Sequence, residues 1–274
     1  MSQNEHDTRP HMQSLLARES LLDKEVMAAT ETPVVSMLPD VHVVKIGGRS
    51  ILEGGRDTVM PVINVLRELL EDEKLILGVG CGARSRHVFS VGLDLGLPTG
   101  VLAELSTADA LGNAHILGTL LAPQGVVAIP PEMFGHLLPL FIRSAPGVIF
   151  NGVPPYSLWE HPSEVGTIPR HRTDAGCLML AECFGCRSMT LVKDVAGLYT
   201  ADPKQDPQAS LIDEISVAEL RRLDLPALPF DEVVLEVLET ARQMKELRLV
   251  DGRDPDNIRR AVRGEAVGTR IYAD

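Results

Sequence analysis

From Val41 onward the chain alternates short apolar runs with longer amphipathic ones, and this alternation restricts the possible folds more than any other feature. Val41–Ile46 is rich in β-branched residues and predicts a strand, whereas apolar residues recur at helical spacing between Val59 and Leu70. Strands separated by helices are typical of α/β proteins whose largely parallel sheet is covered on both faces. The sequence therefore predicts a fold of this class.

The same patterns place the remaining elements along the chain. Further strands are expected at residues 75–79, 126–129, 148–150, 189–193, 247–250 and 268–272. Further helices are expected at residues 87–95, 108–121, 133–142, 173–184, 217–223 and 231–244. Thr173 is expected to cap the helix that it begins. Residues 197–206 predict turns, and the proline-rich, polar segment 151–172 is long enough for a connection to be a candidate functional loop.

Composition excludes several classes of function. The chain has 274 residues, a formal net charge of −12 and a pI near 5.1, whereas a nucleic-acid-binding surface is normally basic. No apolar run approaches the roughly 20 residues that a membrane-spanning helix needs. The polar N-terminus lacks the apolar core of a signal peptide. We therefore expect a cytoplasmic protein without a membrane or nucleic-acid partner.

Four cysteines fit a reducing compartment: Cys81, Cys177, Cys183 and Cys186. The last two form a C-x-x-C pair, which could be redox-active or half of a zinc site. No second Cys or His pair stands at zinc-finger spacing, and the pair lies in an apolar helical run. Buried, unreactive thiols are the favoured interpretation.

Residues 1–40 carry no strong pattern apart from a possible helix across Met12–Met27. We interpret them as an N-terminal extension that becomes ordered only against something else. Residues 41–274 are expected to form one domain.

The first strand ends in the sequence VVKIGGRS, residues 43–50. Lys45 stands beside Gly47 and Gly48, where bare backbone can approach a ligand closely. A lysine next to exposed backbone N–H groups suits an anion. A tight turn with a surface lysine explains the same residues equally well.

A second glycine-rich segment, GVGCGARSRH, follows the second predicted strand. Glycines at alternate positions before a helix offer backbone N–H groups and a helix N-terminus to an anion. The segment is neither a Walker loop nor a good dinucleotide fingerprint, so the signal is weak alone. It is stronger together with Lys45-Ile46-Gly47-Gly48, because both loops follow strands at the edge of the sheet where α/β proteins bind ligands.

Two further segments carry charged residues at predicted element ends. In RTDAGC, Asp174 falls in the first turn of a helix, where a carboxylate offsets the macrodipole. It could instead orient a lysine or hold Mg²⁺ at a phosphate. In LVKDVAGLYTADP, a lysine, an aromatic ring and turn backbone would suit the phosphates and base of a nucleotide.

In this order, K-x-G-G, a glycine loop, T-D-A and K-D-x-x-G-L-Y-T-A-D-P resemble the amino acid kinase family, particularly its bacterial uridylate kinase branch, over residues 41–274. The resemblance implies a three-layer α/β/α sandwich that binds ATP with Mg²⁺. It implies that Lys45 and Lys193 bracket the transferred phosphate and that Asp174 organises both lysines. The other nucleotide-binding residues that it implies are Gly47, Gly48, Gly80, Gly82, Arg84, Asp194, Gly197, Tyr199, Asp202 and Pro203.

A closer resemblance is to the molybdenum-storing members of this family, carried by RHVFSVGLDLGLPTGVLA, PPYSLWEHP and RTDAGCLMLAECFGC. Those members form a closed hexameric cage from two related subunits, and ATP drives the deposition of polyoxomolybdate clusters inside it. The chain resembles the β-type subunit, because it has Ser157-Leu158-Trp159 where the α type carries histidines and Lys193 where the α type is acidic. In this branch the N-terminal extension wraps a neighbouring subunit.

Departures from the kinase pattern separate storage from phosphotransfer. Uridylate kinases carry an asparagine and a further glycine in the second loop, where this chain has Cys81, Ala83 and two arginines. The resemblance makes His115, His136, His161 and His171 candidates for contacts with molybdate clusters, since an imidazole can ligate a metal or hydrogen-bond an oxyanion. A structural role is the alternative for each. His171, in PRHRTD, departs most clearly from the β-type pattern.

These observations predict a subunit that stores molybdenum or tungsten, binds MgATP and assembles with itself or an α-type subunit. One alternative is a uridylate kinase-like phosphotransferase. Another is a degenerate kinase fold that binds nucleotide only as a regulator.

Overall fold

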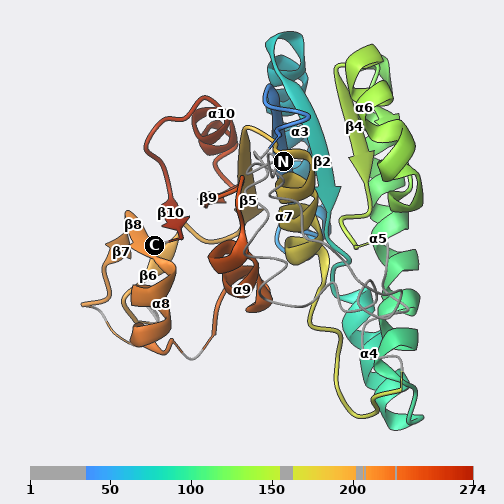
Figure 1. Cartoon of the computed structure of the whole chain (residues 1–274), viewed down its shortest axis with the longest axis vertical. Helices are drawn as coiled ribbons and strands as arrows, with labels where there is room; N and C mark the ends of the chain where they lie inside the picture. The colour runs from blue at the N-terminus through green and yellow to red at the C-terminus, as the bar shows by residue number, and fades with distance from the viewer. Residues whose placement is uncertain (1–34, 155–162, 202–205, 207, 226, 274) are drawn as a thin grey trace, which may run out of the picture. The chain divides into compact units, whose positions relative to one another are not determined.

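An eight-stranded sheet in the order β3-β4-β2-β1-β5-β9-β10-β8 forms the centre of the unit Ser36–Asp274 (Figure 1). Its strands are β1 (Val41–Ile46), β2 (Lys74–Val79), β3 (Val127–Ala128), β4 (Gly147–Phe150), β5 (Ser188–Lys193), β8 (Glu214–Ser216), β9 (Glu246–Asp251) and β10 (Thr269–Tyr272). β10 is antiparallel to β9, and every other neighbouring pair is parallel. A separate antiparallel pair joins β6 (Leu198–Tyr199) to β7 (Leu211–Ile212).

This computed structural model describes residues 35–154, 163–201, 206, 208–225 and 227–273, apart from the side chain of His136. The expected helix at Met12–Met27 lies outside the described residues. The α-helices are α3 (Arg56–Asp72), α4 (Arg84–Asp94), α5 (Thr99–Leu121), α6 (Phe134–Ser144), α7 (Thr173–Phe184), α8 (Val217–Leu223), α9 (Val233–Thr240) and α10 (Asp256–Val262). Short 3₁₀ turns lie at η1 (Leu52–Gly54), η2 (Ala122–Gln124) and η3 (Pro131–Met133). None of the described helices is long and apolar enough to cross a membrane.

Two apolar cores lie on opposite faces of the sheet. One joins strand residues such as Val43 to α6, α7, α8 and α9. The other joins strand residues such as Val44 to α3, α5 and α10. Because successive side chains of a strand point to opposite faces, β1 contributes to both cores and is buried along its whole length. The predicted three-layer arrangement is confirmed.

Several boundaries differ from expectation. α5 begins at Thr99, directly after the extended Pro98, rather than at residue 108. Thr173 is the first residue of α7, and the N-cap position belongs to Arg172, whose side chain makes no cap hydrogen bond, so the predicted capping role of Thr173 is wrong. The segment 197–206 includes the short strand β6. The elements β7, β8 and α10 were not predicted, because they span only two to seven residues and show no long periodic pattern.

Residues before Val41 already belong to the packed unit. The N–H groups of Met37 and Leu38 both donate to the carbonyl oxygen of Phe184, and Leu38 is fully buried. The core therefore begins a few residues before the expected start of the domain.

Candidate functional site

Lys45 and Lys193 project from the carboxyl ends of two adjacent parallel strands. β1 pairs with β5 so that Lys45 lies opposite Leu191 and Ile46 lies opposite Val192, which places Lys193 one residue further along. By the alternation of strand side chains, Lys45 shares the face of Val43, and Lys193 shares that of Leu191. This is the face that α7 covers, so both ammonium groups point toward the start of α7.

Asp174, in the first turn of α7, joins the two lysines. Its Oδ1 lies 2.6 Å from Lys45 Nζ, and Lys193 Nζ donates to Oδ1 at 3.0 Å and to Oδ2 at 2.8 Å. Asp174 and Lys45 are each 3% exposed. The structure thus brings together the three residues predicted to be catalytic.

The charges in this cluster shift one another's pKa values. Burial would raise the pKa of Asp174, but the ammonium groups of Lys193 and Lys45 outweigh burial and hold that pKa well below its usual value. Burial lowers the pKa of Lys193. The carboxylate of Asp174 opposes this shift, and the positive charge of Lys45 adds to it. For Lys45, burial is outweighed by Asp174, and the pKa is raised.

Asp231 and Arg172 complete the cluster, and the sequence-based analysis predicted neither at the nucleotide site. Asp231 is buried just before α9, and its Oδ2 accepts hydrogen bonds from the backbone N–H groups of Asp174 (3.1 Å) and Ala175 (3.4 Å). Arg172 Nη2 lies 2.8 Å from Asp231 Oδ1. Burial, followed by the charge of Asp174, raises the pKa of Asp231.

The two glycine loops meet backbone to backbone. The N–H of Gly47 donates to Val192 O, and the N–H of Gly80 donates to Ile46 O. A Cβ on Gly80 would lie 2.6 Å from the nitrogen of Gly48, so the loops exclude side chains where they touch. Gly82 has a φ of +83°, a left-handed conformation that favours glycine.

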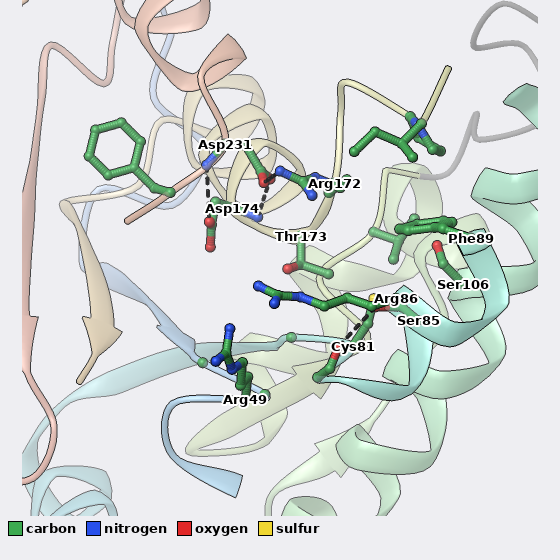
Figure 2. A pocket seen from close by; sticks show the side chains of 18 of the residues that line it. Arg49, Cys81, Ser85, Arg86, Phe89, Ser106, Arg172, Thr173, Asp174 and Asp231 are labelled. Atoms are coloured by element: carbon green, nitrogen blue, oxygen red, sulfur yellow. Dashed lines mark hydrogen bonds and ion pairs between the residues drawn. The ribbon is translucent and has the colours of Figure 1, made fainter. Parts of the chain in front are cut away.

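A cavity of about 860 Å³ opens over these loops and the lysine cluster. In Figure 2, Arg49 reaches into it from the loop after β1 and Arg86 from the first turn of α4. Its lining holds five cationic side chains (Lys45, Arg49, Arg86, Arg172, Lys193) and three carboxylates (Asp174, Asp194, Asp231). The chain as a whole carries −12, so this is a local cationic site in an acidic protein, suited to a phosphate-bearing ligand.

Some predicted nucleotide-binding residues lie in this lining and others do not. Gly47, Gly48, Gly80, Gly82 and Asp194 line the cavity. Arg84, Gly197 and Tyr199 are absent from the lining, and Asp202 and Pro203 lie outside the described residues. A Cβ on Gly197 would lie 2.9 Å from a methyl carbon of Leu211, so its close packing explains that glycine.

The four candidate histidines are not gathered in the described structure. His171 lines the cavity, and His115 is exposed on α5 away from the lining. His161 and the side chain of His136 are outside the described part of the chain. Among the residues that the structure describes, no group of three or more His, Cys, Asp and Glu could hold a metal ion.

All four cysteines are free thiols. Cys177 and Cys186 are buried as expected, but Cys183 is exposed because it faces outward from the last turn of α7. The expectation that both thiols of the C-x-x-C pair are buried is wrong. Burial raises the pKa of Cys183 and takes that of Cys186 to about 12, which leaves both thiols protonated and poorly nucleophilic at neutral pH.

The fold and the lysine cluster together define an α/β protein with a cationic cavity at the carboxyl ends of its central strands. Residues 40–245 match the amino acid kinase family, and the chain belongs to that family. It is 41% identical to molybdenum storage protein subunit beta of Azotobacter vinelandii, over 96% of this chain and 97% of that protein. A uridylate kinase of Thermofilum pendens is 31% identical over 84% of this chain and 97% of the kinase.

Solved structures agree on the fold. The uridylate kinase of Archaeoglobus fulgidus superimposes with a TM-score of 0.65 at 23% identity, covering 84% of this chain and 99% of that one. The predicted resemblance to the β-type storage subunit, with uridylate kinases as more distant relatives, is confirmed.

Proposed function

We propose that this chain is a subunit of an assembly that stores molybdenum, or tungsten, as polyoxometalate clusters. The observation that carries the proposal is its 41% identity over nearly the whole length of a molybdenum storage subunit. Binding and hydrolysis of MgATP in the cationic cavity would drive loading. The partner would be a related α-type subunit or further copies of this chain, arranged as a hexameric cage with the N-terminal residues before Ser36 wrapping a neighbour.

The geometry of the cavity suits ATP phosphates. Phosphoryl transfer to water or another acceptor depends mainly on positioning and on stabilising negative charge. Lys45 and Lys193 supply two ammonium groups that Asp174 holds at fixed positions, 2.6 Å and 2.8 Å from its oxygens. The glycine loops supply backbone N–H groups beside them.

Mg²⁺ would enter with the nucleotide and neutralise charge on its phosphates. Mg²⁺ in such sites is held largely by phosphate oxygens and one or two carboxylates, so a preformed protein cage is not required. Asp194 is the suitable carboxylate of the lining, because Asp174 and Asp231 are engaged with cations. The cavity lining, with one carboxylate left for a metal, therefore suits Mg²⁺ that is bound together with a nucleotide.

A uridylate kinase-like phosphotransferase is the alternative, favoured by the shared lysines and by relatives with that printed name. Against it stands the second loop, where Cys81 and Ala83 replace the expected kinase residues. UDP formed stoichiometrically from ATP and UMP would establish the alternative.

The storage proposal is tested by incubating the protein with MgATP and molybdate, or tungstate, desalting it, and counting metal atoms per subunit. Tens of metal atoms per hexamer are expected. The same count is made for the triple variant His136→Ala/His161→Ala/His171→Ala and for His115→Ala. His87→Ala, a change at an exposed residue of α4, is the control. Retention should fall in the triple variant, because an imidazole can ligate a metal or hydrogen-bond an oxyanion. If the wild type hydrolyses ATP yet retains neither metal, storage is wrong.

A further inference from the structure

Asn113, on α5, is a buried amide that the proposed chemistry does not use. It is 6% exposed, and its Nδ2 donates to the carbonyl oxygens of Gly80 (2.8 Å) and Cys81 (3.1 Å). Its Oδ1 accepts a hydrogen bond from Arg84 Nη2 at 2.7 Å. Reversing the amide would set oxygen against two carbonyls and NH₂ against a guanidinium, so these partners fix its orientation.

These contacts set two peptide planes of the second glycine loop. In a trans peptide the C=O and the following N–H point in opposite directions. Because the carbonyls of Gly80 and Cys81 face Asn113, the N–H groups of Cys81 and Gly82 point away from it. Cys81 and Gly82 line the cavity, Asn113 does not, and no described residue accepts a hydrogen bond from either N–H. Two adjacent N–H groups that point the same way can bind one anion, beside the N–H of Ala83, which already donates to Glu53 Oε1.

Arg84 holds Asn113 from the other side. It is the first residue of α4, with its Nε 3.8 Å from Asp109 Oδ1, one turn before Asn113 on α5. Its side chain is 62% exposed and does not reach the cavity lining. Arg84 is thus placed to act on the loop through Asn113 rather than on a ligand directly.

The geometry points to Asn113 as a positioning residue that keeps the N–H groups of Cys81 and Gly82 aimed at a phosphate or other oxyanion, with Arg84 acting through it. This inference rests on the proposed function, because the anion is the one that the cavity would bind. It adds Asn113, which lies on α5 outside the glycine-rich segment, and it gives Arg84 a role through Asn113 in place of the direct nucleotide contact that the family resemblance implied.

Asn113→Leu removes the hydrogen-bonding amide while keeping the branching and the number of heavy atoms of the side chain, and it should weaken MgATP binding about tenfold, the effect of losing roughly 1.4 kcal/mol. The matched control is Leu117→Ala, one turn further on α5, which is buried in the core and outside the cavity lining. Leu117→Ala should lower the melting temperature at least as much while leaving MgATP affinity within about twofold. Equal loss of affinity in both variants would mean general destabilisation and would overturn the inference.

Arg84→Ala, a change at an exposed side chain, tests whether Arg84 acts through Asn113 (a relay) or contacts the ligand directly. Its effect should be about threefold in the wild type and should vanish in the Asn113→Leu background, because a relay has no function without its second member. Arg84→Lys should restore part of the affinity. An Arg84→Ala effect of the same size in both backgrounds would show direct contact with the ligand and reject the relay.

A readout without any ligand uses the thiol of Cys81. Burial raises its pKa to about 11, so alkylation by N-ethylmaleimide should be slow while the loop is held. Asn113→Leu should speed the modification of Cys81 several-fold. Peptide mass spectrometry measures the rate, and the exposed Cys183 serves as an internal reference whose rate should not change. An unchanged Cys81 rate in that variant contradicts the inference. A wild type that binds no ATP refutes the proposed function alone, since the Cys81 measurement still decides the role of Asn113.

Discussion

Asp174 and Asp231 each accept a hydrogen bond from the backbone N–H of the other, at 3.3 Å from Asp231 N and 3.1 Å from Asp174 N. This reciprocal pair ties the start of α7 to the segment before α9. Two buried carboxylates so close would repel one another, and three cations (Lys45, Lys193, Arg172) offset the repulsion. The position of Asp174 therefore depends on a residue 57 positions away in the chain.

Replacing Asp231 tests this dependence. Asp231→Asn keeps an oxygen acceptor but leaves Arg172 without its carboxylate, so we expect a loss of about 1–3 kcal/mol in unfolding free energy. ATP turnover should fall about tenfold, since a misplaced Asp174 no longer fixes the lysines. Urea denaturation and phosphate release measure the two effects. Glu232→Gln, its exposed neighbour, should change neither.

The two lysines should dominate nucleotide affinity. Lys45→Met or Lys193→Met removes a charge-assisted hydrogen bond to phosphate worth about 1.5–3 kcal/mol, roughly a 10- to 150-fold increase in Kd. Calorimetric titration with MgATP measures it. Lys74→Met is the control, because Lys74 Nζ donates to Ala145 O at the opposite end of the sheet. Unchanged binding and turnover in both active-site variants would remove the phosphate-site interpretation.

The ion pairs of Asp174 predict a defined pH dependence. The pKa of Asp174 in the folded protein is lowered from the ordinary value of 3.8. Its contribution to stability is therefore fully present above pH 3.8 and is lost as the pH falls from 3.8 through the lower pKa of the folded state. Asp174→Asn should therefore cost a constant amount between about pH 8 and about pH 5, and the difference from wild type should shrink at lower pH. Denaturant midpoints at a series of pH values measure it, and a difference that grows on acidification would contradict the assignment.

A structural carboxylate elsewhere should affect stability without affecting the site. Glu182, near the end of α7, accepts hydrogen bonds at 2.7–2.9 Å from the backbone N–H groups of residues 242–244. Burial opposes ionisation, but these donors lower the pKa of Glu182. Glu182→Gln should cost about 1–3 kcal/mol with normal ATP turnover. Glu239→Gln, which breaks only an exposed pair with Arg221, should cost less than about 1 kcal/mol.

Much of the architecture followed from local patterns. β1 at Val41–Ile46 and α8 at Val217–Leu223 have the predicted bounds, because a β-branched run and a short amphipathic segment each allow one interpretation. α8 also begins with a capping box between Ser216 and Glu219, a local signal of helix start. The short elements β7, β8 and α10 were not predicted, because they carry neither a β-branched run nor a helical periodicity long enough to stand out.

The site was predictable where a motif carried it. Lys45, Asp174 and Lys193 were selected from the family resemblance, and the strand register explains how they meet. Asp231 and Asn113 were not selected, because their partners lie 57 and 32–33 residues away and no local spacing records such contacts. Supporting residues of this kind become visible only when packing brings distant elements together.

The ends of the sheet also restrict how this chain can meet its neighbours. The edge strands are β3, with two residues, and β8, with three. A long row of unpaired backbone groups would invite another chain to add a strand, and in the described sheet neither edge offers one. In an assembly of the kind proposed above, contacts between subunits would therefore involve side chains on helices and loops, and α5 exposes Val101, Leu105 and Ile116. Such contacts would be specified by shape and sequence, so they could discriminate between a further copy of the chain and a related partner in a way that strand addition could not.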